Sequence, residues 1–260
     1  MKLGFTFNKI FSVKDLAEFG FDFLELPMNF LHSMTEEEQD AFLAEMKTYG
    51  LTADSCCSFF GKEVVMMGDD IDLSVVEEAT LKNLAVAEKF GMKIVVIGSG
   101  GARKIPEGYP VEKAKERFAS VVRACADICQ TKGMKVVIEP LRRSETNFIN
   151  TALDGLEMKN YIDHPAVGCL VDFFHLYTNE ENYDDVKKLG NNLIHAHFAR
   201  PNPDRLPPKA EDEKTVQNWL QILKDINYDA RLVLECSWRN ALPDVLGALN
   251  EMKPLLPLFK

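Results

Sequence analysis

Residues 133–140 read GMKVVIEP and combine the two features that decide the fold of this chain. A glycine directly after a helical segment favours the left-handed conformation that ends a helix. The apolar run that follows it is typical of a strand buried on both faces. The same join recurs at Gly20, Gly50, Gly91 and Asn227, each followed by a run rich in apolar residues. The pattern therefore predicts a chain built from repeated helix–strand units.

Eight such runs occur along the 260 residues, and helical periodicity fills the gaps between them. The helical pattern is clear over 114–128, where apolar residues form one stripe, and a last helical segment covers about 241–256. Ser12, Thr35 and Asp72 are suitable N-caps for three of the helices. The predicted strands lie at about 2–7, 22–27, 52–59, 93–98, 135–140, 168–173, 193–199 and 231–236.

The alternation of strands and helices determines the predicted fold class. Parallel strands joined by helices require right-handed crossovers, and eight such units in about 250 residues match the size of a TIM barrel. We therefore predict an α/β fold, a (β/α)8 TIM barrel that forms a single domain over residues 1–260. A doubly wound open sheet is the alternative. In a barrel, the active site lies at the carboxyl ends of the strands.

The overall charge limits the classes of partner. The chain holds 30 lysines and arginines against 40 aspartates and glutamates, a net charge of −10, which disfavours nucleic acids and anionic membranes. It contains no apolar run long enough to cross a bilayer, and its first residues show no export leader. The six cysteines form no CxxC pair. We therefore expect a reduced, cytoplasmic protein with neither nucleic-acid nor membrane partners.

Four consecutive predicted strands end in ionisable side chains, although a strand buried on both faces should stay apolar. Glu139, Asp172 and Glu235 end the fifth, sixth and eighth strands. The seventh carries His195 and His197, which share a face because side chains alternate along a strand. In a barrel these ends meet at one rim, where unpaired buried charge is costly. Three carboxylates with an imidazole therefore predict a divalent cation, and this oxygen-rich set favours Mn²⁺, Mg²⁺ or Co²⁺ over structural zinc.

Each of these residues also has an ordinary interpretation. A strand-end glutamate is usually a solvated rim residue, and a His-x-His pair on a strand is more often hydrogen-bonded in the core. Four such groups on successive strands at the catalytic end favour the metal site. His175 lies just above Asp172 and suits a supporting or substrate-binding role, whereas His195, one layer deeper, suits structural support. His32 and His164 lack this context and are expected at the surface.

The order of these motifs resembles the xylose isomerase-like TIM barrels known as sugar phosphate isomerases and epimerases, and in particular the ketose 3-epimerases. The resemblance covers essentially the whole chain and implies the same barrel fold. It is carried by short stretches at strand ends: 20–27 (GFDFLELP), 98–103 (GSGGAR), 138–141 (IEPL), 171–175 (VDFFH), 195–197 (HAH) and 234–235 (LE).

The resemblance implies a role for each candidate residue. Ketose 3-epimerases hold one divalent metal, commonly Mn²⁺ (Mg²⁺, Co²⁺ or Zn²⁺ also suit the site), and the matching ligands here are Glu139, Asp172, His197 and Glu235. The two glutamates match the acid–base pair of the family. His175 matches a loop histidine that contacts substrate, and Arg205 is the candidate for a substrate-binding arginine, with Arg200 as its competitor.

Two further residues, Arg103 and Glu25, complete the candidate substrate contacts. Arg103 follows the glycine-rich segment 98–101. Such a loop can cradle a phosphate at a helix N-terminus, although this one lacks the lysine and serine or threonine of a P-loop. A tight turn that packs over the barrel mouth is the alternative, so phosphorylation of the substrate stays open.

The implied activity is that of a metal-dependent sugar isomerase or epimerase acting on a small carbohydrate. One glutamate would remove a proton next to a carbonyl, and the other would return one to the resulting metal-stabilised cis-enediolate. The alternative is a metal-dependent lyase or dehydratase acting on a keto-sugar or keto-inositol, which would begin with the same removal of a proton next to the carbonyl. An AP endonuclease needs more histidines on the early strands, and a non-catalytic sugar-binding protein would have lost ligands. The resemblance leaves homo-oligomerisation open.

Overall fold

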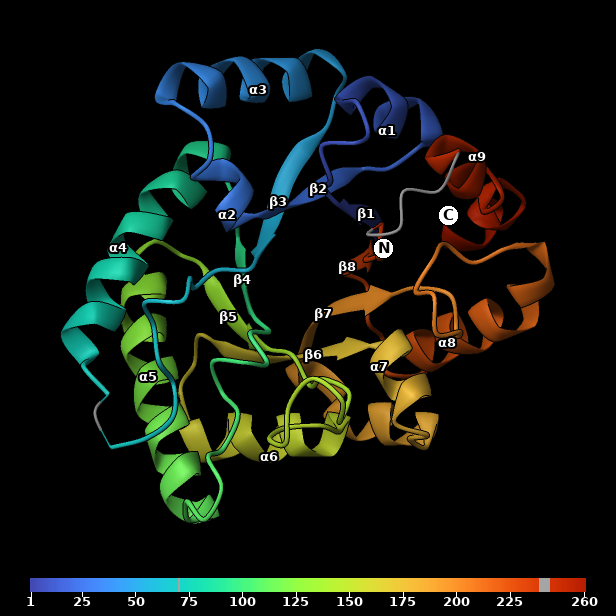
Figure 1. The fold of residues 1–260 in the computed structure, drawn as a ribbon. Coiled ribbons are helices and arrows are strands. Elements are labelled where there is room, and N and C mark those ends of the chain that lie inside the picture. Colours follow the sequence, from blue (N-terminus) through green and yellow to red (C-terminus); the bar gives the residue numbers. More distant parts are fainter. Residues whose placement is uncertain (70, 239–243) are drawn as a thin grey trace.

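Eight parallel strands close into a barrel in chain order, with β8 pairing back to β1. The computed structural model describes residues 1–69, 71–238 and 244–260. Helices surround the barrel on its outer side (Figure 1). The predicted (β/α)8 fold is confirmed, and the open doubly wound sheet is wrong. The strands are β1 (Lys2–Thr6), β2 (Phe23–Pro27), β3 (Thr52–Cys57), β4 (Ile94–Ile97), β5 (Lys135–Ile138), β6 (Val167–Asp172), β7 (Leu193–Phe198) and β8 (Arg231–Leu234).

The helices follow the strands as expected, except that two connections are partly 3-10 helix. The α-helices are α1 (Val13–Phe19), α2 (Met28–Leu31), α3 (Glu36–Thr48), α4 (Leu73–Phe90), α5 (Val111–Thr131), α6 (Ala152–Ile162), α7 (Phe173–Thr178), α8 (Glu213–Asp225) and α9 (Val245–Asn250). The 3-10 segments are η1 (Tyr183–Asn192), η2 (Ala210–Asp212) and η3 (Lys253–Phe259). The helix predicted over 241–256 begins outside the described residues; its remainder is α9 followed by η3, which contains Pro257.

The predicted helix ends are confirmed by their capping geometry. The side chains of Ser12, Thr35 and Asp72 accept hydrogen bonds from backbone N–H groups in the first turns of α1, α3 and α4. Gly20 and Gly91 end α1 and α4 with φ of 110° and 79°. Only glycine adopts this conformation at little steric cost, so each join turns the chain sharply from helix into strand.

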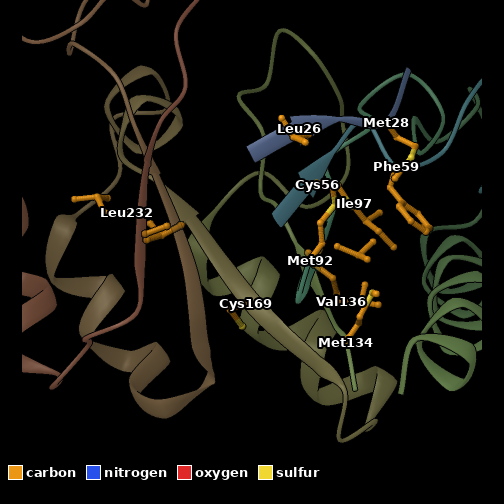
Figure 2. Packing of buried hydrophobic residues seen from close by; sticks show 14 of the residues in the cluster. Leu26, Met28, Cys56, Phe59, Met92, Ile97, Met134, Val136, Cys169 and Leu232 are labelled. Atoms are coloured by element: carbon orange, nitrogen blue, oxygen red, sulfur yellow. The ribbon is translucent and has the colours of Figure 1, made fainter. Parts of the chain in front are cut away.

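The main hydrophobic core lies between the barrel and its helices. Cys56, Ile97 and Val136 gather on neighbouring strands in Figure 2 and are buried, and the stripe on α5 that includes Phe118 and Val122 packs into the same core. All six cysteines are free thiols, and five of them are buried. Among the described residues, no helix is both long and apolar enough to cross a bilayer.

The barrel interior changes from apolar to polar along the strands. A small apolar cluster that includes Val96, Val137 and Leu170 fills part of the interior. Because inward positions recur every second residue, the next inward residues after Val137 and Leu170 are Glu139 and Asp172. On β5 and β6, the strand ends therefore place charged side chains directly above apolar ones.

Candidate metal centre

Four potential metal ligands meet at the carboxyl ends of β5 to β8, which are neighbours in the barrel (Figure 1). One ligand atom from each lies within 4.8 Å of the others; the four residues are Glu139, Asp172, His197 and Glu235. The strand register explains the convergence, because Asp172 pairs with His197 across β6 and β7. Three of the four are buried, and the side chain of Glu235 is 20% exposed, so the cluster opens to solvent on one side.

His197 lies at the centre of this cluster. Its Nδ1 is 3.4 Å from Glu139 Oε1 and 3.1 Å from Glu235 Oε2, yet this buried nitrogen has no well-directed hydrogen bond within the described part of the chain. An imidazole nitrogen surrounded by carboxylate oxygens is a donor set that suits a hard divalent cation such as Mn²⁺ or Mg²⁺. The residues present therefore fit the metal that the sequence predicts.

The two glutamates of the cluster have opposite electrostatic environments. Burial and the charge of Glu235 raise the pKa of Glu139 to about 7. Burial also acts to raise the pKa of Glu235, but the positive charges of Arg205 and His197 outweigh it and lower that pKa to about 2. In the metal-free protein near neutral pH, Glu139 can therefore hold a proton while Glu235 is ionised, so the two carboxyl groups differ in their affinity for a proton.

Arg205 reaches the cluster from the loop after β7, where its backbone has a positive φ of 50°. Its Nη2 lies 2.6 Å from Asp172 Oδ2 and also forms an ion pair with Glu235. Its guanidinium carbon lies 4.8 Å from the ring centroid of Phe174. The competing arginine, Arg200, instead pairs with Asp212 and Glu211. Of the two candidates, the structure thus brings Arg205 to the cluster.

His175 lies on α7, directly after β6, and is buried beside the cluster. Its Nε2 is 3.4 Å from Asp172 Oδ2 and 3.8 Å from Glu139 Oε1. Its Nδ1 accepts a hydrogen bond from the backbone N–H of Arg142, so Nε2 carries the proton of the neutral ring. Burial lowers the pKa of His175, which favours the neutral form. The residue is thus a hydrogen-bond donor directed at the cluster.

Arg103, which the sequence predicts to contact substrate, is directed into the interior of the protein instead. Its side chain is fully buried, and Nη2 donates to the backbone carbonyl of Glu139 at 2.5 Å. The carbonyls of Ile97 and Ile149 lie 3.5 Å from its guanidinium nitrogens. The guanidinium therefore satisfies carbonyl groups at the ends of β4 and β5 and supports the backbone from which Glu139 projects.

Glu25, the other residue that the sequence predicts to contact substrate, also lies in the interior. It is fully buried, and its carboxylate lies on the side of His197 opposite Nδ1, within 3.3 Å of Nε2. The other donors to Glu25 are His195 Nε2 at 2.8 Å, Ser55 Oγ at 2.9 Å and Thr6 Oγ1 at 3.2 Å. Glu25 therefore lies one layer below the four ligands, together with His195, which the sequence predicts to lie deeper than His197.

The two remaining histidines lie away from the cluster. His32 Nε2 is 2.6 Å from Asn83 Oδ1, and His164 Nε2 is 3.1 Å from Asp127 Oδ1. His32 is exposed and His164 is half-buried. Neither has a place in the predicted site.

A cavity of about 610 Å³ lies above the cluster and was not predicted. Arg205 and Glu235 line it together with Arg142, Glu145 and Trp238. These last three come from the loops after β5 and β8, and nothing in their local sequence marks them as lining residues. A larger cavity of about 1080 Å³ lies over the ends of β2 to β4, and none of the four ligands lines it.

Gly98 has a steric role that motif reasoning missed. A Cβ at this position would lie 1.9 Å from Glu139 Oε2. The side chain of Glu139 therefore occupies space that only glycine leaves free. This steric contact is sufficient to explain the glycine at the end of β4, so a phosphate-binding role is not needed to account for it.

Comparison with known proteins places the chain in a family. Residues 13–255 match the model of the xylose isomerase-like TIM barrel, which is nearly the whole chain. The chain belongs to this family.

Known members of the xylose isomerase-like family resemble the chain in sequence and in fold. It is 24% identical over 243 residues to a probable ketose 3-epimerase of Synechocystis sp., covering 90% of this chain and 80% of that protein. It is 26% identical over 239 residues to a D-psicose 3-epimerase of Agrobacterium fabrum, covering 86% and 77%. A crystal structure of a D-psicose 3-epimerase, determined in the presence of D-fructose, matches with a TM-score of 0.83, at 18% identity over 99% of this chain and 98% of that one. The predicted family and enzyme class, an isomerase, are confirmed.

Proposed function

We propose that this protein is a divalent-metal-dependent sugar epimerase that inverts a carbon atom next to a carbonyl group. The convergence of three carboxylates and one imidazole at the open end of the barrel carries the proposal. Its relatives support the substrate class, because their names identify them as epimerases of ketoses.

The proposed metal ligands are Glu139, Asp172, His197 and Glu235. When bound there, the cation, which we propose to be Mn²⁺, supplies positive charge next to the substrate oxygens on which negative charge develops. The remaining steps depend on side chains of the chain itself.

Glu139 and Glu235 form the proposed acid–base pair. They project from β5 and β8, three strands apart around the rim, so a substrate that lies between them presents one face to each. In one direction, ionised Glu235 removes the proton from the carbon and Glu139 donates a proton to the opposite face. The broken C–H bond is replaced by a new one on the other side, which inverts the carbon. The reverse reaction exchanges the two roles.

Arg205 and His175 are the proposed substrate-binding residues. Both are donors directed at the cluster, and Arg205 also lines the cavity above it. A volume of about 610 Å³ lies within the range of small-molecule sites. Their hydrogen bonds would orient the hydroxyl groups of a sugar so that the reacting carbon lies between the two glutamates.

Incubation with a panel of ketoses and keto-polyols in deuterated water with Mn²⁺ tests this function. We expect deuterium at a single carbon and an epimeric product, detected by NMR, with no activity after chelation and recovery with Mn²⁺ or Co²⁺. Glu139→Gln and Glu235→Gln should abolish exchange, whereas Glu157→Gln, an exposed carboxylate on α6 outside the ligand set and the cavity, should retain it. Wild-type rates in either of the first two variants would disprove the acid–base assignment. A product that has lost water would instead indicate a lyase.

A further inference from the structure

A second polar layer lies directly below the proposed metal ligands and has no part in the acid–base chemistry. It consists of Thr6, Glu25, Ser55 and His195. Glu25, on β2, carries the negative charge of this layer and is fully buried. A carboxylate buried in this way is strongly destabilising unless several donors compensate it, so its presence inside the barrel requires an explanation.

Donors from three other strands converge on the carboxylate of Glu25. Oε2 accepts from His195 Nε2 at 2.8 Å and from Ser55 Oγ at 2.9 Å. Oε1 accepts from Thr6 Oγ1 at 3.2 Å and lies 3.2 Å from His197 Nε2. These contacts hold the carboxylate in one orientation, because each oxygen is held by groups on different strands.

The contact with His197 determines what that ring presents to the cluster above. An ionised carboxylate only accepts hydrogen bonds, so His197 Nε2 must carry a proton toward Glu25. Binding of a cation at this ring requires its neutral form, in which the lone pair is then on Nδ1, the nitrogen that faces Glu139 and Glu235. We propose that Glu25 is a positioning residue that fixes the tautomer and ring orientation of His197, so that Nδ1 binds the divalent cation. This inference rests on the proposed metal-dependent function.

The second layer could instead hold a metal ion of its own, because Glu25, His195 and His197 also bring ligand atoms within 4.8 Å of one another. The observed contacts favour the positioning role. Ser55 and Thr6 already donate to the two carboxylate oxygens, and the side chains of Glu25 and Ser55 are fully buried. The two rings lie edge to face, with centroids 5.0 Å apart, and both direct Nε2 at the same carboxylate.

Metal binding by Glu25→Gln tests the inference without depending on turnover. A glutamine cannot accept hydrogen bonds at both of its terminal atoms, so we expect Mn²⁺ affinity, measured by calorimetry, to fall by about 10- to 100-fold. Ser55→Ala is the matched control, because it removes one hydrogen bond to the same carboxylate and leaves the contact with His197 intact. In the Mg²⁺-loaded wild type, ¹H–¹⁵N spectra should show His197 protonated at Nε2 only, and in Glu25→Gln this single tautomer should be lost.

The outcomes separate this inference from the proposed function. If the wild type does not bind Mn²⁺, the proposed function fails. If the wild type binds one Mn²⁺ and Glu25→Gln binds it equally tightly, the positioning role is wrong, and two ions per chain would also overturn it. Should Glu25→Gln not fold, Glu25→Asp keeps the negative charge but shortens the side chain, which withdraws the carboxylate from His197 Nε2. We expect weaker Mn²⁺ binding in that variant, and unchanged binding would refute the inference.

Discussion

Replacing Glu139 by glutamine should stabilise the metal-free protein at alkaline pH, although it removes a proposed catalytic group. Burial and the charge of Glu235 raise the pKa of Glu139 from its ordinary value of 4.5 to about 7. Because the folded state favours the protonated form, the stability that this proton contributes is complete below pH 4.5. It is lost as the pH rises to about 7. The shift corresponds to roughly 3 kcal/mol of unfolding free energy, at about 1.4 kcal/mol per pKa unit.

Urea denaturation of wild type and Glu139→Gln with EDTA, at pH 5 and pH 8.5, measures this effect. The amide does not titrate, so the stability of the variant relative to wild type should increase by roughly 2 to 3 kcal/mol between the two pH values. Comparing the two pH values cancels any constant effect of the amide on packing. With saturating Mn²⁺, the wild type should instead be the more stable of the two proteins. The variant has lost a metal ligand, so it gains less stability from binding the ion. If the difference in unfolding free energy between variant and wild type does not change with pH, the proposed pKa shift of Glu139 is refuted.

Three further substitutions test the surroundings of the cluster. Gly98→Ala places a methyl group 1.9 Å from Glu139 Oε2, so activity and Mn²⁺ affinity should fall while circular dichroism stays unchanged; a fully active variant would contradict the steric role. Arg103→Leu leaves the carbonyl of Glu139 without its donor and should lower the unfolding free energy by about 2 to 4 kcal/mol in urea, whereas an undiminished midpoint would count against its structural role. Arg205→Met removes a positive charge that lowers the pKa of Glu235, so the pKa of this carboxyl in the metal-free protein, followed by ¹³C NMR, should rise; an unmoved pKa would disprove this coupling.

The barrel and the four proposed ligands could be predicted from local patterns. Glycine joins such as Gly91 mark where helices end, and strand alternation places His195 and His197 on one face. Parallel strands in a barrel bring all carboxyl ends to one rim, so Glu139 and Glu235 had to be near one another once the fold was known.

The long side chains in loops could not be assigned in this way. Arg103 and Arg205 both lie in segments after strands, yet one extends into the interior and the other reaches the cluster. Their directions depend on which carbonyls or carboxylates the folded chain brings within reach. Arg200 is turned toward Glu211 and Asp212 for the same reason. Local sequence does not encode these distances.

By itself, the sequence determined the order of helices and strands, the inward face of each strand and the set of charged residues at the strand ends. These follow from backbone preferences and from alternation, which act over a few residues. Only the tertiary structure decided the depth of each side chain in the barrel. Glu25 lies level with Thr6 and Ser55 because of the register between β1, β2 and β3. That register is set by the closure of the whole sheet, so it places Glu25 beneath His197 rather than beside a substrate.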